Sequence, residues 1–137
     1  MTRKRIILFV ILGAVALIII ASAIGIPIMI NRADENMAEL TELTIEDIDL
    51  TSLADGEYKA SYNAFTIAVE VRTRVNNHKI TCIDLVKHIN GQGGEAESIL
   101  ETVLEKQSLL VDTVSGATYS SKAILKAIEI ALKKGIN

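Results

Sequence analysis

The sequence is poor in the residues that usually build disulfide scaffolds and acid–base centres. Its 137 residues include one Cys, one Pro, two His and no Trp. The single cysteine, Cys82, cannot close a disulfide within the chain, which excludes a disulfide scaffold. His78 and His88 are accompanied by no Ser-His-Asp arrangement of plausible spacing and by no paired carboxylates in an apolar setting. With no metal-ligand cluster and no phosphate-binding P-loop either, nothing indicates an enzyme with its own substrate chemistry.

Basic residues are also in the minority, and the net charge is −3. Their only cluster, Arg3-Lys4-Arg5, abuts an apolar run, and no basic face interleaved with aromatic residues follows it. We therefore expect no nucleic-acid partner.

The apolar residues are concentrated near the N-terminus. Ile6 to Ile30 contains no charged residue and exceeds the about 20 residues that a helix needs to cross a bilayer. A signal peptide is the alternative, because Ala21-Ser22-Ala23 resembles a cleavage site behind a basic n-region. Cleavage there would leave the apolar segment Ile24 to Ile30 exposed at the new terminus. We therefore prefer a retained transmembrane anchor in the lipid bilayer of the cytoplasmic membrane.

Charge predicts the orientation of this anchor. Three basic residues precede the span, whereas Arg32 is the only basic residue shortly after it. The N-terminus should therefore be cytoplasmic and the C-terminal domain extracytoplasmic, with a single pass between them. The expected organisation is a basic n-region (1–5), a transmembrane anchor (6–30), an acidic stalk or linker (31–53) and a folded domain (54–137).

The folded domain begins with three strand patterns. Residues 57–64 read as the first, and residues 65–75 alternate apolar and polar side chains as a half-buried strand does. Asn76-Asn77-His78 predicts a hairpin turn, because Asn tolerates positive φ. Residues 79–86 return as a third strand with apolar groups on both faces, which predicts a strand covered on both sides. Cys82, within it, is expected to be a small buried hydrophobe.

Two helical patterns complete the domain. Glu95 to Lys106 is amphipathic, and Ser121 to Lys134 carries an apolar stripe followed by Gly135. The fold class is therefore α+β: a small antiparallel sheet backed by two helices and preceded by one N-terminal transmembrane helix.

A turn of small residues, 111–122, joins the two helical patterns. Gly116 permits a tight bend there, and Thr118 to Ser121 supply hydroxyls where a helix starts. Backbone N–H groups at such a start attract anions, so an exposed hydroxyl would lie beside a phosphate-favouring site. The local pattern alone favours a simpler interpretation, in which Thr118 or Ser120 caps the helix.

The run Asp112-Thr113-Val114-Ser115-Gly116-Ala117-Thr118 resembles the flavinylation motif of the FMN-binding domain family. Members include flavin-carrying subunits of bacterial sodium-pumping NADH:quinone and ferredoxin:NAD oxidoreductases. The similarity extends over roughly residues 50–135, including the segments 55–58, 87–93 and 105–108. It implies that a flavin transferase joins FMN, through its phosphate, to Thr118.

The resemblance implies further cofactor-binding residues around that bond. Asp112, Ser115, Gly116, Ala117 and Tyr119 surround it in the motif, and His88, Gly91 and Gly93 belong to a Gly-rich loop that approaches the flavin in related domains. The larger electron-transfer subunits carry a Glu-Thr-Pro-Gly-like run at that loop, so this chain departs from them there. Asp112 has two candidate roles, hydrogen bonding within the turn or recognition by the transferase. Because the chain has no Trp, the candidates for stacking on the flavin ring are Tyr58, Tyr62, Tyr119 and Phe65.

The function implied by the resemblance is that of a membrane-anchored extracytoplasmic electron carrier. Its partners would be a membrane electron donor and an extracytoplasmic acceptor, or the subunits of a membrane redox complex. Two alternatives stay open. One is an interaction or ligand-sensing module in which the turn only caps a helix, and the other is a flavin-dependent reductase of a small acceptor.

Overall fold

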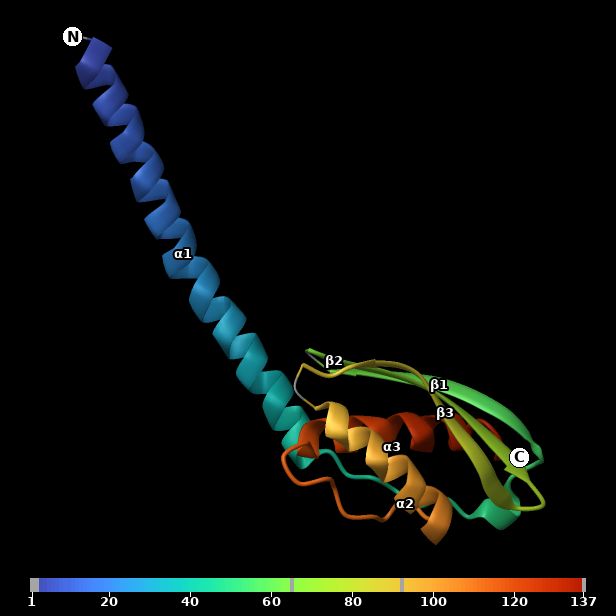
Figure 1. Cartoon of the computed structure of the whole chain (residues 1–137). Helices are drawn as coiled ribbons and strands as arrows, with labels where there is room; N and C mark the ends of the chain where they lie inside the picture. Colours follow the sequence, from blue (N-terminus) through green and yellow to red (C-terminus); the bar gives the residue numbers. More distant parts are fainter. Residues whose placement is uncertain (1–2, 65, 92, 137) are drawn as a thin grey trace. The chain divides into compact units, whose positions relative to one another are not determined.

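The computed structural model describes residues 3–64, 66–91 and 93–136 (Figure 1). Phe65 and Gln92, which belong to segments discussed above, lie outside the described residues. The chain divides into two compact units, Met1–Asn36 and Met37–Asn137.

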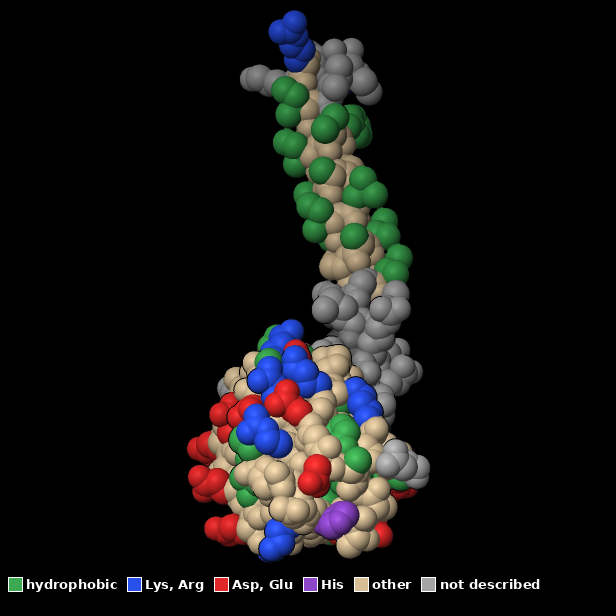
Figure 2. Space-filling view, turned by 90° about the vertical axis from the view of Figure 1, so that its right-hand side faces the viewer, with side chains coloured by type: hydrophobic (Ala, Val, Ile, Leu, Met, Phe, Trp, Pro, Cys, Tyr) green, Lys and Arg blue, Asp and Glu red, His purple; other side chains and the backbone are tan. Residues whose placement is uncertain are grey.

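The first unit consists largely of helix α1 (Arg3–Glu42), which ends inside the second unit. Its segment Ile7–Ile24 is apolar and long enough to cross a membrane, a property that a signal sequence near the N-terminus shares. The Ser22 hydroxyl bonds the backbone oxygen of Ile18 at 2.8 Å, so this polar group is satisfied within the helix. Figure 2 shows hydrophobic side chains over the described part of this helix, whereas basic and acidic side chains intermix on the domain.

The sheet has three antiparallel strands in the order β1-β2-β3. They are β1 (Gly56–Ala64), β2 (Ile67–Asn76) and β3 (Lys79–Ile89). Asn77 and His78 have φ of 49° and 60° between β2 and β3. Two consecutive positive φ angles are what a type I′ hairpin turn requires, and the predicted turn is therefore confirmed.

The prediction that the third strand is covered on both sides is wrong. β3 lies at the edge of the sheet, where Val86 and Ile89 are 46 % and 52 % exposed. The register with β2 shifts between Glu70 and Val71 and between Arg74 and Val75. Each shift inserts an extra residue in β3. Apolar residues that do not alternate strictly along the sequence can therefore still face the core.

Cys82, on the same strand, is partly buried rather than fully buried. Its Sγ donates a hydrogen bond to Asp84 Oδ1 at 3.4 Å. Burial and the neighbouring carboxylate raise the pKa of the Cys82 thiol, so the thiol form is favoured over the reactive thiolate.

Two helices cover one face of the sheet, as predicted (Figure 1). The 3₁₀ segment η2 (Gly94–Ser98) precedes α2 (Ile99–Lys106), so the first residues of the predicted 95–106 helix wind more tightly than an α-helix. The last helix, α3 (Thr118–Lys133), begins three residues earlier than predicted. The core is built around α3, most of whose residues are buried, and it includes the face of the sheet on which α3 packs. Its largest fully buried apolar side chains are Leu40, Leu53, Ile99, Leu109, Ile124, Leu125, Ile128, Leu132, Val69, Val71 and Val75.

The chain between α1 and β1 packs into this domain and contains the 3₁₀ turn η1 (Leu50–Ser52). Asp47 accepts hydrogen bonds from Ser108 Oγ at 2.7 Å and from the Leu109 N–H at 2.9 Å. Burial alone would raise the pKa of Asp47, but these bonds and one from the Ile48 N–H outweigh it and hold that pKa below its ordinary value. The ionised carboxylate therefore fixes the start of the segment that leads to the motif.

Candidate functional site

The candidate site is built around the first turn of α3. The helix N-cap is Ala117, and no side chain in the described part of the chain bonds the cap. The first N–H to bond back into the helix start is that of Ser121, to the Ala117 carbonyl at 2.9 Å. The N–H groups of the three preceding residues have no intrahelical partner, as at any helix start. The interpretation of Thr118 or Ser120 as a helix cap is therefore wrong, because the N-cap is Ala117 and both hydroxyl residues lie inside the helix.

The turn before the helix holds Thr118 at this end. The Ala117 N–H donates to the Val114 carbonyl at 3.0 Å, and Gly116 has a φ of +80°. A positive φ at the third position is what a type II turn requires, which explains the glycine. The Ser121 side chain is fully buried, and its Oγ accepts from the Val114 N–H at 3.0 Å. This hydroxyl ties the turn to the helix.

The sequence pattern predicts Ser121 only as one of several hydroxyls at a helix start. The sequence does contain a pattern that predicts burial of this side chain, because Ser121 precedes Ile124 and Ile128 at helical spacing. That spacing puts it on the buried stripe of α3. A hydroxyl on an apolar stripe needs a hydrogen-bond partner, which here is the motif backbone.

The facing wall is the Gly-rich loop that follows β3. The Gly93 N–H donates to the Asn90 carbonyl at 2.9 Å, which closes a turn. A Cβ on Gly93 would lie 2.1 Å from Ser120 Oγ and 2.8 Å from Ser120 Cβ. Rotation of Ser120 would move its Oγ but not its Cβ, so only glycine lets the loop approach α3 this closely.

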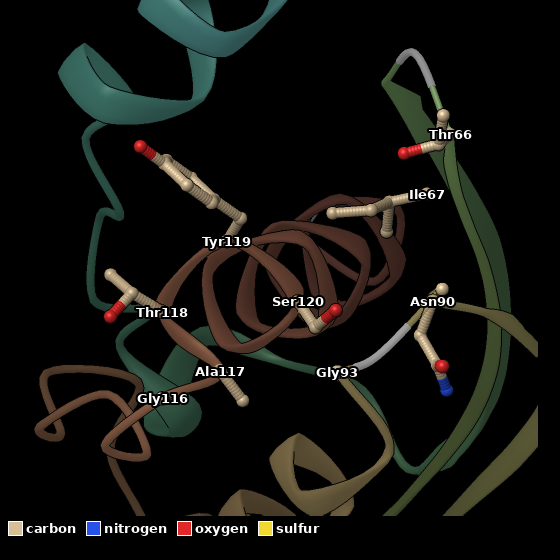
Figure 3. Close-up of a pocket in the computed structure, with 10 residues that line it drawn as sticks. Thr66, Ile67, Asn90, Gly93, Gly116, Ala117, Thr118, Tyr119 and Ser120 are labelled. Carbon is tan, nitrogen blue, oxygen red and sulfur yellow. The ribbon is translucent and has the colours of Figure 1, made fainter.

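Between the two walls lies a pocket of about 350 Å³ (Figure 3). This volume falls within the range of roughly 300–1,000 Å³ that small-molecule sites occupy. Figure 3 shows the Ser120 hydroxyl directed toward the Asn90 side, whereas the Thr118 side chain points to the other side of the helix start. The lining residues are Thr66, Ile67, Asn90, Gly91, Gly93, Gly116, Ala117, Thr118, Tyr119 and Ser120.

Six of the nine residues predicted for the site line this pocket: Gly91, Gly93, Gly116, Ala117, Thr118 and Tyr119. Asp112 and Ser115 are exposed and lie outside the lining. The Asp112 carboxylate has no hydrogen-bond partner among residues 3–64, 66–91 and 93–136. Its side chain therefore does not brace the turn.

His88, the ninth residue, is not among the residues that line the pocket. Its side chain is only 3 % exposed, and its Nδ1 is 3.0 Å from Glu97 Oε1. The same nitrogen is 3.1 Å from Nδ2 of Asn90, which does line the pocket. His88 can therefore act on the pocket through Asn90.

Thr66, Ile67 and Asn90 also line the pocket, although they lie outside the predicted set of site residues. They come together because the three strands are antiparallel, so the end of β1, the start of β2 and the end of β3 lie at the same end of the sheet. The pairing of Ala68 with Ile89 brings these segments side by side. The predicted hairpin order of the strands could have placed these residues at one end of the sheet. The pocket also depends on how α3 packs against that end, which the order of the strands does not give.

Among the candidate stacking residues, Tyr119 lies at the pocket and is 36 % exposed. The Tyr58 hydroxyl donates to the Ala54 carbonyl at 2.7 Å, and its ring packs beside Gly135, beyond the other end of α3. Tyr62 is half-buried against the core. Phe65 lies outside the described residues. Tyr119 is therefore the described aromatic residue that can contact a ring in this pocket.

Residues 62–133, over half of the chain, match the sequence profile of the FMN-binding domain. The chain belongs to the FMN-binding domain family. A protein of Treponema pallidum (strain Nichols), named only as uncharacterized, is 26 % identical over 126 residues. The match covers 89 % of this chain and 35 % of that relative, so the chain spans about a third of the relative's length.

The residues at the pocket fit FMN. The uncapped start of α3 offers N–H groups to a phosphate, and the macrodipole of the helix favours negative charge there. Gly91, Gly93 and Gly116 keep side chains out of the pocket walls, and Tyr119 offers an apolar ring at the rim. Family membership and this set of donors together support a flavin-binding module suited to electron transfer.

Proposed function

We propose that this chain carries FMN covalently, through a phosphoester to Thr118, and serves as an electron carrier. The observation that carries the proposal is the exposed Thr118 hydroxyl on an uncapped helix start, within the motif and beside the pocket. FMN would supply the redox chemistry. The protein would hold it and set its potential through hydrogen bonds, burial and charge.

Particular residues support this role. A phosphodiester at Thr118 keeps one negative charge, which the free N–H groups of the first turn of α3 can offset. Gly116 lets the backbone turn closely at that position. Because the Asp112 carboxylate bonds no described residue, its role is better explained by recognition by the flavin transferase than by turn geometry.

The proposed location is the cytoplasmic membrane, with one pass and the flavin domain outside the cytoplasm. The apolar segment Ile7–Ile24 and the basic residues before it support this topology. Protease added to intact cells stripped of their wall is expected to remove the domain. A domain protected from protease would contradict the orientation, and a mature N-terminus near Ile24 would contradict the retained anchor.

A carrier should depend on partner proteins for both of its electron transfers. We propose a membrane donor together with an extracytoplasmic acceptor, or the subunits of a membrane redox complex. Reduction of the purified, flavin-loaded chain by NADH alone is therefore expected to be slow, and turnover with a soluble acceptor should be negligible. Rapid partner-free reduction with turnover would instead establish a flavin-dependent reductase.

A further inference from the structure

A buried histidine links an exposed carboxylate to the pocket wall. His88, near the end of β3, has a buried side chain, and its Nδ1 contacts both Glu97 of η2 and Asn90. The distances are 3.0 Å to Glu97 Oε1 and 3.1 Å to Asn90 Nδ2. The other ring nitrogen, Nε2, is buried and has no hydrogen-bond partner among the described residues.

These contacts restrict the position of the imidazole proton. A single ring nitrogen can donate or accept a hydrogen bond, but it cannot do both. A proton on Nδ1 satisfies the Glu97 carboxylate, which only accepts. A proton on Nε2 would leave a buried N–H without an acceptor and would set the Nδ1 lone pair against the carboxylate. The geometry therefore favours the proton on Nδ1.

The position of this proton decides how the Asn90 carboxamide is turned. With a proton on Nδ1, the Asn90 atom beside the ring must be the acceptor, its Oδ1. The oxygen and nitrogen of a carboxamide exchange places by a half turn without changing its shape. The NH₂ group then lies on the edge of the carboxamide turned away from His88, and Asn90 is one of the residues that line the pocket.

We propose that Glu97 is a positioning residue that acts through His88 to present the Asn90 NH₂ group to the pocket. The effect on bound flavin rests on the proposed function. A fixed donor in the pocket wall stabilises the more negatively charged, reduced form of the flavin. The Glu97–His88–Asn90 chain therefore raises the midpoint potential.

The first test needs no flavin. Only two histidines are present, so ring ¹⁵N labelling of the full-length chain in detergent gives two sets of signals, and His78 serves as an internal reference. His88 is expected to carry its proton on Nδ1 in the wild type and in Glu95→Ala, the matched control from the same 3₁₀ segment. Glu97→Ala should populate both tautomers. A wild-type proton on Nε2, or an unchanged tautomer in Glu97→Ala, overturns the proposal.

The second test measures the midpoint potential of the flavin-loaded chain. Loss of a nearby negative charge would by itself raise the potential, because a carboxylate opposes reduction. The positioning role predicts the opposite sign, a lower potential in Glu97→Ala than in the wild type or Glu95→Ala. It also predicts that Glu97→Ala adds no such decrease in an Asn90→Ala background, since the two residues act in one chain. A raised potential, or a decrease that persists without Asn90, contradicts the proposal.

The two tests separate this inference from the proposed function. A chain that takes up no flavin in a host with a flavin transferase contradicts the proposed function, while the tautomer of His88 is still measured. A chain that is loaded with flavin but shows the same tautomer and potential in Glu97→Ala contradicts the positioning role alone.

Discussion

Replacing Thr118 with Val is expected to abolish all flavin that survives denaturation. Val has the shape of Thr but lacks the hydroxyl that the phosphoester needs. The Thr118 side chain is exposed and caps nothing, so the free energy of unfolding should change by less than about 0.5 kcal/mol. The measurement is in-gel flavin fluorescence after denaturing electrophoresis, with the protein made in a host that contains a flavin transferase.

Neighbouring hydroxyls provide the comparison. Ser120 and Ser121 are buried, and Ser121 is engaged with the Val114 N–H, so a transferase would reach neither easily. Ser115 is exposed but lies outside the pocket lining. Thr113→Val is the matched control and should keep its fluorescent band. A fluorescent band from Thr118→Val would show that another residue carries the flavin.

The second large effect concerns Glu129, a buried carboxylate on α3. Its side chain is 1 % exposed and accepts hydrogen bonds from Lys126 Nζ at 2.9 Å and Lys133 Nζ at 2.7 Å. It also accepts from the Glu46 N–H at 3.1 Å, which ties the segment after α1 to the domain. Burial alone would raise the pKa of Glu129. The hydrogen bonds from Lys133, Lys126 and the Glu46 N–H outweigh that effect and hold the pKa below its ordinary value.

Glu129→Gln is therefore expected to lower the free energy of unfolding by roughly 1.5–3 kcal/mol at neutral pH, the magnitude of hydrogen bonds to a charged group. The two lysines reach solvent, so the loss should stay below that of a fully enclosed ion pair. Denaturant unfolding of the full-length chain measures the difference. Glu46→Gln is the matched control, because its exposed ion pair with Lys133 should contribute at most about 1 kcal/mol.

The same carboxylate predicts a pH dependence. Because the folded-state pKa of Glu129 is depressed, its stabilisation is fully present above the unfolded-state pKa and is lost as pH falls through the folded-state pKa. The difference between the wild type and Glu129→Gln should therefore shrink in acid. A difference that stays constant from neutral to acid pH would mean that shape, rather than charge, accounts for the loss.

Much of the fold could be predicted because its signals are local. Alternation along residues 65–75 predicted β2, and the Asn-rich turn predicted the hairpin. The prediction that both faces of β3 are covered is wrong because it assumes a strict alternation of side chains. The two register shifts with β2 break that alternation. The start of α3 was placed too late, because Thr118 to Ser120 have low helix propensity and read as loop.

The site was predictable in part, for a similar reason. Motif residues such as Thr118 and Gly116 are contiguous, so a resemblance can identify them together. Thr66 and Asn90 join them only through strand pairing and through the packing of α3 against that end of the sheet. The resemblance predicts His88 near the cofactor, but its contact with Asn90 depends on side-chain packing that no sequence pattern encodes.

The intact mass of the chain purified from its native host tests the central claim most directly. The proposed phosphoester predicts an increment equal to FMN less one water, which peptide mapping assigns to the fragment holding Thr118. An unmodified mass in a host shown to contain an active flavin transferase, or the same increment on a fragment without Thr118, would contradict the account.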